Sequence, residues 1–220
     1  YRGSLPKNSE NFGNYLKALY SREVKHMSAP KYSKEMIRDL VDRKLSWTVL
    51  KQIMSSPKDS DRFDKYVEVL QEKVPWKEKI LLPIGEHLFI VCKEGKPIVK
   101  AACGHEFGDY RENWKLKTLI YVRDTEEKLK EIYPGLGKYD TSIAEVREYY
   151  CPGCGNLLDV EPMALGYPIM FEFLPDIEAF YKKWLGRPLP CGTGEVGGVQ
   201  DRSTELLKSW AKEIEKKANP

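Results

Sequence analysis

The chain lacks any long apolar run, and its first residues are polar. Nothing in it approaches the roughly 20 apolar residues of a membrane span, or the apolar core of a signal peptide. We therefore expect a cytoplasmic protein that does not enter a membrane. The sequence also has no P-loop and no nucleophile elbow, so it offers no self-sufficient active site and no catalytic residue to name.

Neither sign of charge is in excess. The 220 residues include 36 basic and 33 acidic side chains, a formal net charge of +3, and no basic run that would favour nucleic acid. A content of 31% charged and 41% hydrophobic residues is typical of a soluble globular protein with one sizeable core and small appendages. A structural metal would therefore add to a core and not replace it.

Cysteine is scarce, but two of the five cysteines are spaced for metal binding. Cys151 and Cys154 form a C-x-x-C pair on a Pro-Gly turn, and two thiolates at this spacing can bind one tetrahedral ion. Upstream, Cys103 and His105 offer a second pair. Three sulfurs and one imidazole match the closed coordination of a structural zinc ion, which leaves no position for substrate. We predict Cys103, His105, Cys151 and Cys154 as the metal ligands.

The C-x-H spacing is shorter than that of the usual knuckle, so His105 is the weakest member of this set. Cys92 is the alternative fourth ligand, although a small buried strand residue is the favoured interpretation of it. Cys191, at the edge of a Gly-rich linker, is predicted to be a free exposed thiol. A reducing compartment favours thiolate ligation over disulfides in a protein of this size.

Apolar periodicity predicts helices first and strands afterwards. An amphipathic helix is expected within residues 1–30, and three more helices between Ser33 and Pro75, the first two capped by Ser33 and Ser46. Short strands are then expected at residues 80–82, 88–92, 97–102, 116–122, 146–150 and 157–160. A short helix capped by Asp124 or Thr125, a helix over residues 175–185 and a final helix with an apolar face complete the prediction.

These elements predict an α+β fold, in which a zinc-ribbon-like small β-sheet region is flanked by N-terminal helices and C-terminal amphipathic helices. Four parts are expected: an N-terminal arm with an amphipathic helix (1–30), a helical segment (31–75), a zinc-ribbon-like α+β domain (76–190), and a Gly-rich linker with the C-terminal helix (191–220). The linker spells G-x-G-x-x-G from Gly192, but prolines precede it where a dinucleotide site needs a strand.

Several long, irregular stretches resemble the gamma subunit of acetone carboxylase. They are SSPKDSDRFDKYVEVLQEKVPWKEKILLPIG (55–85), CGHEFGDYRENWKLKTLIYVRDTEEKLKEIYPGLG (103–137), REYYCPGCGNLLDVE (147–161) and PDIEAFYKKWLGRPLP (175–190). The family often carries C-x-C-G-H at the first knuckle, and here Ala101 stands at the leading cysteine position. That departure favours His105 as the fourth ligand.

The resemblance implies an ATP-dependent ligase that forms acetoacetate from acetone and bicarbonate. In that family the complex is a paired heterotrimer, a heterohexamer, in which two large hydantoinase-like subunits carry ATP and a divalent metal. This chain would be its small zinc-binding, non-catalytic subunit, with no nucleic acid or membrane partner. Acetophenone or another ketone is an alternative substrate of such a complex. A different class, a free-standing zinc-ribbon adaptor that binds nucleic acid or a regulatory protein, would need a basic face supplied by Arg111, Lys115, Lys117 and Arg123.

Overall fold

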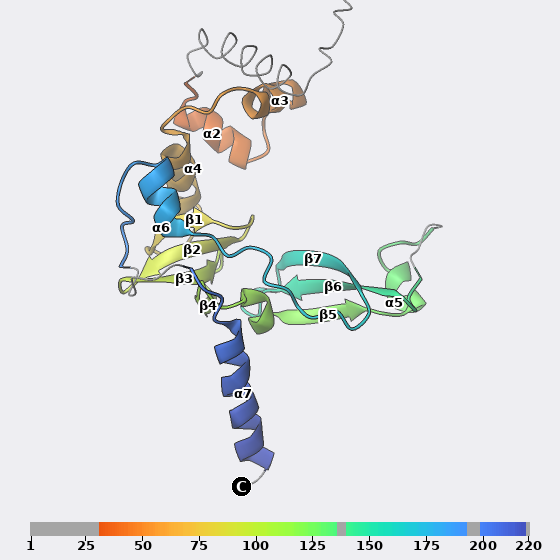
Figure 1. The fold of residues 1–220 in the computed structure, drawn as a ribbon. Helices are drawn as coiled ribbons and strands as arrows, with labels where there is room; N and C mark the ends of the chain where they lie inside the picture. The colour runs from red at the N-terminus through yellow and green to blue at the C-terminus, as the bar shows by residue number, and fades with distance from the viewer. Residues whose placement is uncertain (1–30, 136–139, 193–198, 219–220) are drawn as a thin grey trace, which may run out of the picture. The chain divides into compact units, whose positions relative to one another are not determined.

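The computed structural model describes residues 31–135, 140–192 and 199–218 (Figure 1). It divides into two compact units, Tyr1–Leu70 and Gln71–Pro220. The amphipathic helix predicted within residues 1–30 lies outside the described residues. Among the described residues, no helix has the length and apolar character that crossing a membrane requires.

The first unit contains α2 (Lys34–Val41), α3 (Trp47–Ser55) and the start of α4 (Arg62–Gln71). Both predicted caps are confirmed: the Ser33 side chain accepts a hydrogen bond from the Met36 N–H and the Ser46 side chain from the Val49 N–H, which satisfies donors that a helix start leaves free. Tyr32, Ile37, Ile53 and Val69 form the buried core. Trp47, by contrast, is 70% exposed and takes no part in that core.

A buried carboxylate links the loops of this unit. Asp59, whose side chain is 3% exposed, pairs with Arg62 at 2.6 Å and with Lys65 at 3.3 Å, and it accepts a hydrogen bond from the Tyr32 N–H. Burial raises the pKa of Asp59, but these hydrogen bonds outweigh burial and hold the pKa at about 2. The ionised form of Asp59 therefore stabilises the unit.

The second unit begins with a four-stranded antiparallel sheet in the order β1-β2-β3-β4. Its strands are β1 (Lys79–Pro83), β2 (Leu88–Lys93), β3 (Lys96–Ala101) and β4 (Glu106–Asp109). A hairpin turn joins β2 to β3, and its residues Glu94 and Gly95 both have positive φ, as tight hairpin turns require. Strand β4 has no counterpart among the predictions, because four residues with one buried side chain, Phe107, give no periodic signal.

A second antiparallel sheet has the order β5-β6-β7 and consists of β5 (Leu119–Arg123), β6 (Ala144–Tyr150) and β7 (Leu157–Ala164). The strand predicted over residues 116–122 starts late: Asn113 caps a 3-10 helix, η1 (Trp114–Lys117), which turns the Lys115 side chain into the interior. Thr125 caps the short helix α5 (Glu126–Lys130), one of the two caps predicted.

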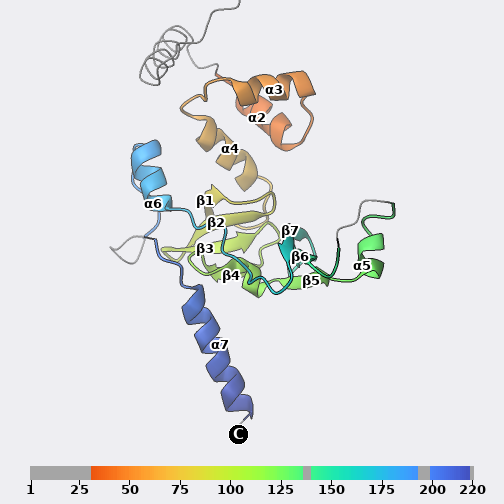
Figure 2. The same cartoon turned by 45° about the vertical axis from the view of Figure 1, so that its right-hand side comes forward.

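The helix predicted over residues 175–185 is present, as α6 (Ile177–Ala179) followed by a π-helical turn, η2 (Phe180–Trp184). Asp176 caps it, and the Tyr181 hydroxyl donates to the Leu81 carbonyl of β1 at 3.0 Å. The last helix is α7 (Ser203–Ala218). Figures 1 and 2 show that α7 begins near the sheets and extends away from them. On this helix, Leu207 and Ile214 are 47% and 66% exposed.

The prediction of a free thiol at Cys191 is wrong. Cys191 and Cys92 form a disulfide, with their Cα atoms 5.7 Å apart, so Cys92 is also not the alternative fourth ligand. Cys191 and Leu189 pack against the core of the first sheet, where Cys92 lies on β2. This contact joins residues 99 positions apart, and no local pattern in the sequence reports it.

Candidate metal centre

The first knuckle follows β3. The Ala101 N–H donates to the His105 carbonyl at 2.8 Å, and the Gly104 N–H donates to the Ala101 carbonyl at 2.9 Å. Gly104 has φ +100, a conformation that disfavours any side chain, so the glycine allows the chain to reverse within four residues. This turn presents the Cys103 thiol at the end of the first sheet.

The second knuckle joins β6 to β7. The Cys151 N–H donates to the Asn156 carbonyl at 2.9 Å, and the Gly155 N–H donates to the Cys151 carbonyl at 2.8 Å. Both cysteines are thus held on one closed turn that belongs to the second sheet. The predicted placement of both pairs at strand ends is confirmed.

The two knuckles touch at Gly153. A Cβ atom on this residue would lie 2.9 Å from the His105 Cβ and 3.4 Å from the Cys103 Sγ. Separations below 3.0 Å do not occur between real Cβ atoms and their neighbours, so only glycine permits this approach. The close contact of the turns brings thiols from two different sheets together.

Three sulfurs meet at this point. The Sγ atoms of Cys103 and Cys151 are 3.6 Å apart, and those of Cys103, Cys151 and Cys154 all lie within 4.8 Å of one another. A zinc ion with Zn–S bonds of about 2.3 Å holds its sulfurs about 3.8 Å apart at the corners of a tetrahedron. The three thiols therefore have the spacing and the chemistry that fit zinc.

The environments of the thiols differ. Cys151 is fully buried, and burial raises the pKa of its thiol to about 11. A hydrogen bond from the Asn156 backbone lowers the pKa of the exposed Cys154 thiol. Because a metal binds the thiolate form, binding at Cys151 releases a proton, and affinity is expected to rise with pH.

His105 lies beside the thiols but outside the cluster. Its ring packs edge-on against Phe107, with centroids 4.9 Å apart, and its nitrogens are not among the ligand atoms that share the 4.8 Å spacing. Its Cβ nevertheless faces the second knuckle at Gly153. The structure thus brings three of the four predicted ligands together, and the role of His105 stays a prediction.

Trp76 supports the first knuckle. Its indole N–H donates to the carbonyls of Ala101 and Ala102 at 3.2 and 3.1 Å, and its ring lies 3.5 Å from the position of a Cβ on Gly104. A half-buried tryptophan that satisfies two turn carbonyls fixes the backbone from which Cys103 projects. Sequence reasoning missed Trp76 because it lies far from the knuckle along the chain.

A second group of ligand-type side chains is occupied by a lysine. Asp159, Glu161 and Glu172 surround the Lys115 ammonium, which is 2.7 Å from Asp159, 3.0 Å from Glu172 and in contact with Glu161. Burial lowers the pKa of Lys115, but the hydrogen bonds to these carboxylates outweigh burial and raise it. Because Lys115 stays charged between the carboxylates, this cluster links η1 to β7 and is not a metal centre.

Three carboxylates that follow the first knuckle in the sequence form ion pairs with basic side chains. Asp109 pairs with Arg111 and Arg202, Glu112 with Lys117, and Asp124 with Lys128. Each of these carboxylates is therefore engaged in an ion pair.

Two small antiparallel sheets, flanking helices and a thiol cluster at the meeting of two knuckles define an α+β protein with a zinc-ribbon-like centre. The family model described as acetone carboxylase gamma subunit matches residues 74–185, which include all four predicted ligands. The chain belongs to this family.

Two relatives are similar to the chain over different lengths. The acetone carboxylase gamma subunit of Xanthobacter autotrophicus is 49% identical over 161 residues, which are 72% of this chain and 96% of that protein. The acetophenone carboxylase beta subunit of Aromatoleum aromaticum is 28% identical over 79 residues, 35% of this chain and 61% of that protein. Both names describe subunits of ketone carboxylases.

Proposed function

We propose that the chain is the small, zinc-binding structural subunit of an ATP-dependent acetone carboxylase, which forms acetoacetate from acetone and bicarbonate. Two large hydantoinase-like subunits would carry ATP, a divalent metal and the catalytic residues, in a paired heterotrimer located in the cytoplasm. The observation that carries this proposal is the family match over residues 74–185, which spans the whole thiol cluster. Acetophenone or another ketone is the alternative substrate.

The cluster supports a structural metal. Cys103, Cys151 and Cys154 would hold zinc, and His105 would supply the fourth ligand after its ring turns from Phe107. A fully ligated zinc ion has no position for substrate or water, so its effect is to fasten two turns from two sheets. Catalysis by other chains is consistent with such a centre.

The ion pairs of the second unit give no support to the nucleic-acid adaptor. The basic face that this alternative needs would consist of Arg111, Lys115, Lys117 and Arg123. Every one of them pairs with a carboxylate: Asp109 for Arg111, the buried cluster for Lys115, Glu112 for Lys117, and Glu148 with Glu131 for Arg123. Cations engaged in this way would have to give up these carboxylates before they could form the salt-sensitive phosphate contacts of a nucleic-acid site.

Native mass spectrometry of the complex purified from its source, together with metal analysis, tests the proposal. We expect the chain to co-purify with two larger chains and to contain about one zinc ion per copy, as a single closed site requires. The isolated chain should show no ketone carboxylation with ATP. Carboxylation by the isolated chain, or a native chain that associates with no other protein, would contradict the proposal.

A matched pair of variants separates metal binding from general damage. Cys151→Ser should lose zinc and reduce assembly with the large chains. Lys93→Ser changes an exposed residue of the same unit, which is paired with Glu106, and should retain both. Zinc bound undiminished by Cys151→Ser would exclude the thiol cluster as the metal site.

A further inference from the structure

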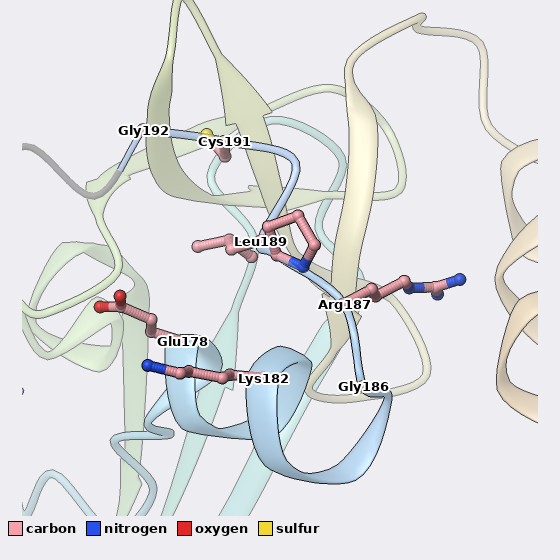
Figure 3. Close-up of a pocket in the computed structure, with 8 residues that line it drawn as sticks. Glu178, Lys182, Gly186, Arg187, Leu189, Cys191 and Gly192 are labelled. Carbon is pink, nitrogen blue, oxygen red and sulfur yellow. The ribbon is translucent and has the colours of Figure 1, made fainter.

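The disulfide between Cys92 and Cys191 fixes a segment that we call the strap, residues 186–192. It follows η2, and Figure 3 shows it running from Gly186 past Leu189 to Cys191. The disulfide joins Cys191 to Cys92 on β2. A hollow of 570 Å³ lies between the strap and the helix before it. Glu178 and Lys182 line it from the helix, and Leu189 and Cys191 line it from the strap.

Among the described residues, backbone hydrogen bonds are found at the start of the strap and not at its end. At its start, the Arg187 N–H donates to the Tyr181 carbonyl at 3.1 Å. Beyond that point, no backbone hydrogen bond joins residues 188–192 to any other described residue. Leu189 packs on the core of the first sheet, and the backbone at Gly192 lies so near the Gly95 carbonyl that a Cβ would be 3.0 Å from it. The disulfide, and not backbone hydrogen bonding, is therefore the main connection between the end of this segment and the first sheet.

The chain after the strap has its own anchors. The Arg202 N–H donates to the Arg111 carbonyl at 2.8 Å, and the Arg202 guanidinium pairs with Asp109 at 3.2 Å. The Asn113 N–H donates to the hydroxyl of the buried Ser203 at 2.8 Å. The start of α7 is thus held by contacts that do not involve the disulfide.

The chain carries free thiols beside the disulfide. Cys103, Cys151 and Cys154 are free, whereas Cys92 and Cys191 are bonded to each other. A disulfide exchanges with a dithiol reductant where its sulfurs are accessible. Cys92 and Cys191 are both only half-buried, and the Cys191 side chain borders the open hollow (Figure 3). A reductant can therefore approach this bond from the solvent.

We propose that Cys92–Cys191 is a redox latch. A dithiol reductant attacks the disulfide through its thiolate and forms a mixed disulfide. Its second thiol then closes the reductant's own disulfide, and Cys92 and Cys191 leave as two thiols that have gained two electrons and two protons. Reduction releases residues 188–192 from β2 and removes the Cys191 wall of the hollow. Neither Cys92 nor Cys191 belongs to the thiol cluster of the candidate metal centre.

Hydrogen–deuterium exchange on the full chain loaded with zinc tests the latch. Peptides are compared before and after reduction with dithiothreitol, and the two cysteines are mapped by alkylation. We expect reduction to accelerate exchange of the Arg187 amide, which donates to the Tyr181 carbonyl, by about tenfold or more, because this hydrogen bond opens when the strap is released. Exchange at β2, β3 and residues 203–210 should not change.

The double variant Cys92→Ser, Cys191→Ser is the matched control. It should show the fast strap exchange without reductant, and dithiothreitol should change nothing further, which excludes an effect through the zinc thiolates. The latch is overturned if Cys92 and Cys191 are alkylated as free thiols in protein prepared without reductant. It is equally overturned if the bond resists excess dithiothreitol in the folded chain, or if strap exchange is the same in both states.

Discussion

Gly153 lies where the two knuckles of the metal centre touch. A Cβ atom there would lie 2.9 Å from the His105 Cβ. The His105 Cβ is bonded directly to the backbone of a tight turn, so it cannot move far. Separating the turns would pull the Cys103 and Cys151 sulfurs away from the 3.6 Å spacing that suits zinc. The glycine therefore matters to the metal although it is not a ligand.

We expect Gly153→Ala to lower zinc affinity by about 10- to 100-fold, the range known for residues that orient metal ligands. Competition with a chromophoric zinc chelator measures this. Gly135→Ala is the control, because nothing lies within 4 Å of a Cβ at that glycine. Equal affinities of the two variants would mean that the knuckles separate without consequence for the metal.

Asp59 gives the first unit its own dependence on pH. Its pKa is lowered from 3.8 in the unfolded chain to about 2 in the folded chain, so its contribution is complete above about pH 4 and is lost as the pH falls towards 2. The shift corresponds to about 2 kcal/mol. Asp59→Asn should remove this contribution to stability at pH 7. The stability of the variant should then fall less steeply between about pH 4 and pH 2, the acid limb of its pH dependence.

Amide exchange of α2 and α4, followed between pH 2 and pH 7, measures this effect. Asp61→Asn is the control, since Asp61 is 52% exposed and its pair with Lys65 contributes at most about 1 kcal/mol. An unchanged acid limb in Asp59→Asn would show that other carboxylates govern the acid unfolding of this unit.

At the scale of elements, local signals predicted the ends of the helices and most of the strands. Ser33, Ser46 and Thr125 cap helices through hydrogen bonds with residues three positions on, which a sequence displays directly. The cysteine pairs were found in the same way, because each lies within one turn. The start of β5 was misplaced because the burial of Lys115 depends on carboxylates 44 to 57 residues away along the chain.

Lys115 is the link between η1 and the second sheet. Its side chain is 4% exposed and that of Glu161 is 5% exposed, and the Tyr149 hydroxyl donates to the second oxygen of Glu161 at 2.6 Å. Burial and the hydrogen bond to Glu161 raise the pKa of Tyr149, so the phenol stays protonated as a donor. This network fixes β6 and β7 on either side of the Cys151 turn.

Lys115→Met should destabilise the second unit by about 3–5 kcal/mol, since it leaves the buried Glu161 carboxylate without its cation. Lys93→Met, at a pair with Glu106 that is 38% and 33% exposed, should cost less than about 1 kcal/mol. Urea unfolding at pH 7 compares the two variants. A small effect at Lys115 would mean that the carboxylates bind protons or solvent when the lysine is removed.

At the scale of the whole molecule, long-range contacts determine the features of the fold that could not be predicted from the sequence. Three contacts join distant parts of the second unit. They are the disulfide between Cys92 and Cys191, the approach of Gly153 to His105, and the support that Trp76 gives to the Cys103 turn. The thiol cluster itself joins its two sheets, one knuckle from each. The described residues of the first unit form a separate core, and none of them belongs to that cluster.

Removal of zinc should therefore act on one unit and spare the other. Zinc at a free concentration a thousandfold above its Kd stabilises a folded site by about 4 kcal/mol, and a chelator removes that contribution. Amide exchange of the full chain, with zinc and after treatment with a strong chelator, should show faster exchange in β3, β4, β6 and β7 and no change in α2 and α3. The strap double variant, Cys92→Ser with Cys191→Ser, should respond to the chelator as the unaltered chain does. Faster exchange in α2 and α3 would show that the metal centre stabilises both units, and no change in either sheet would exclude a structural role for the metal.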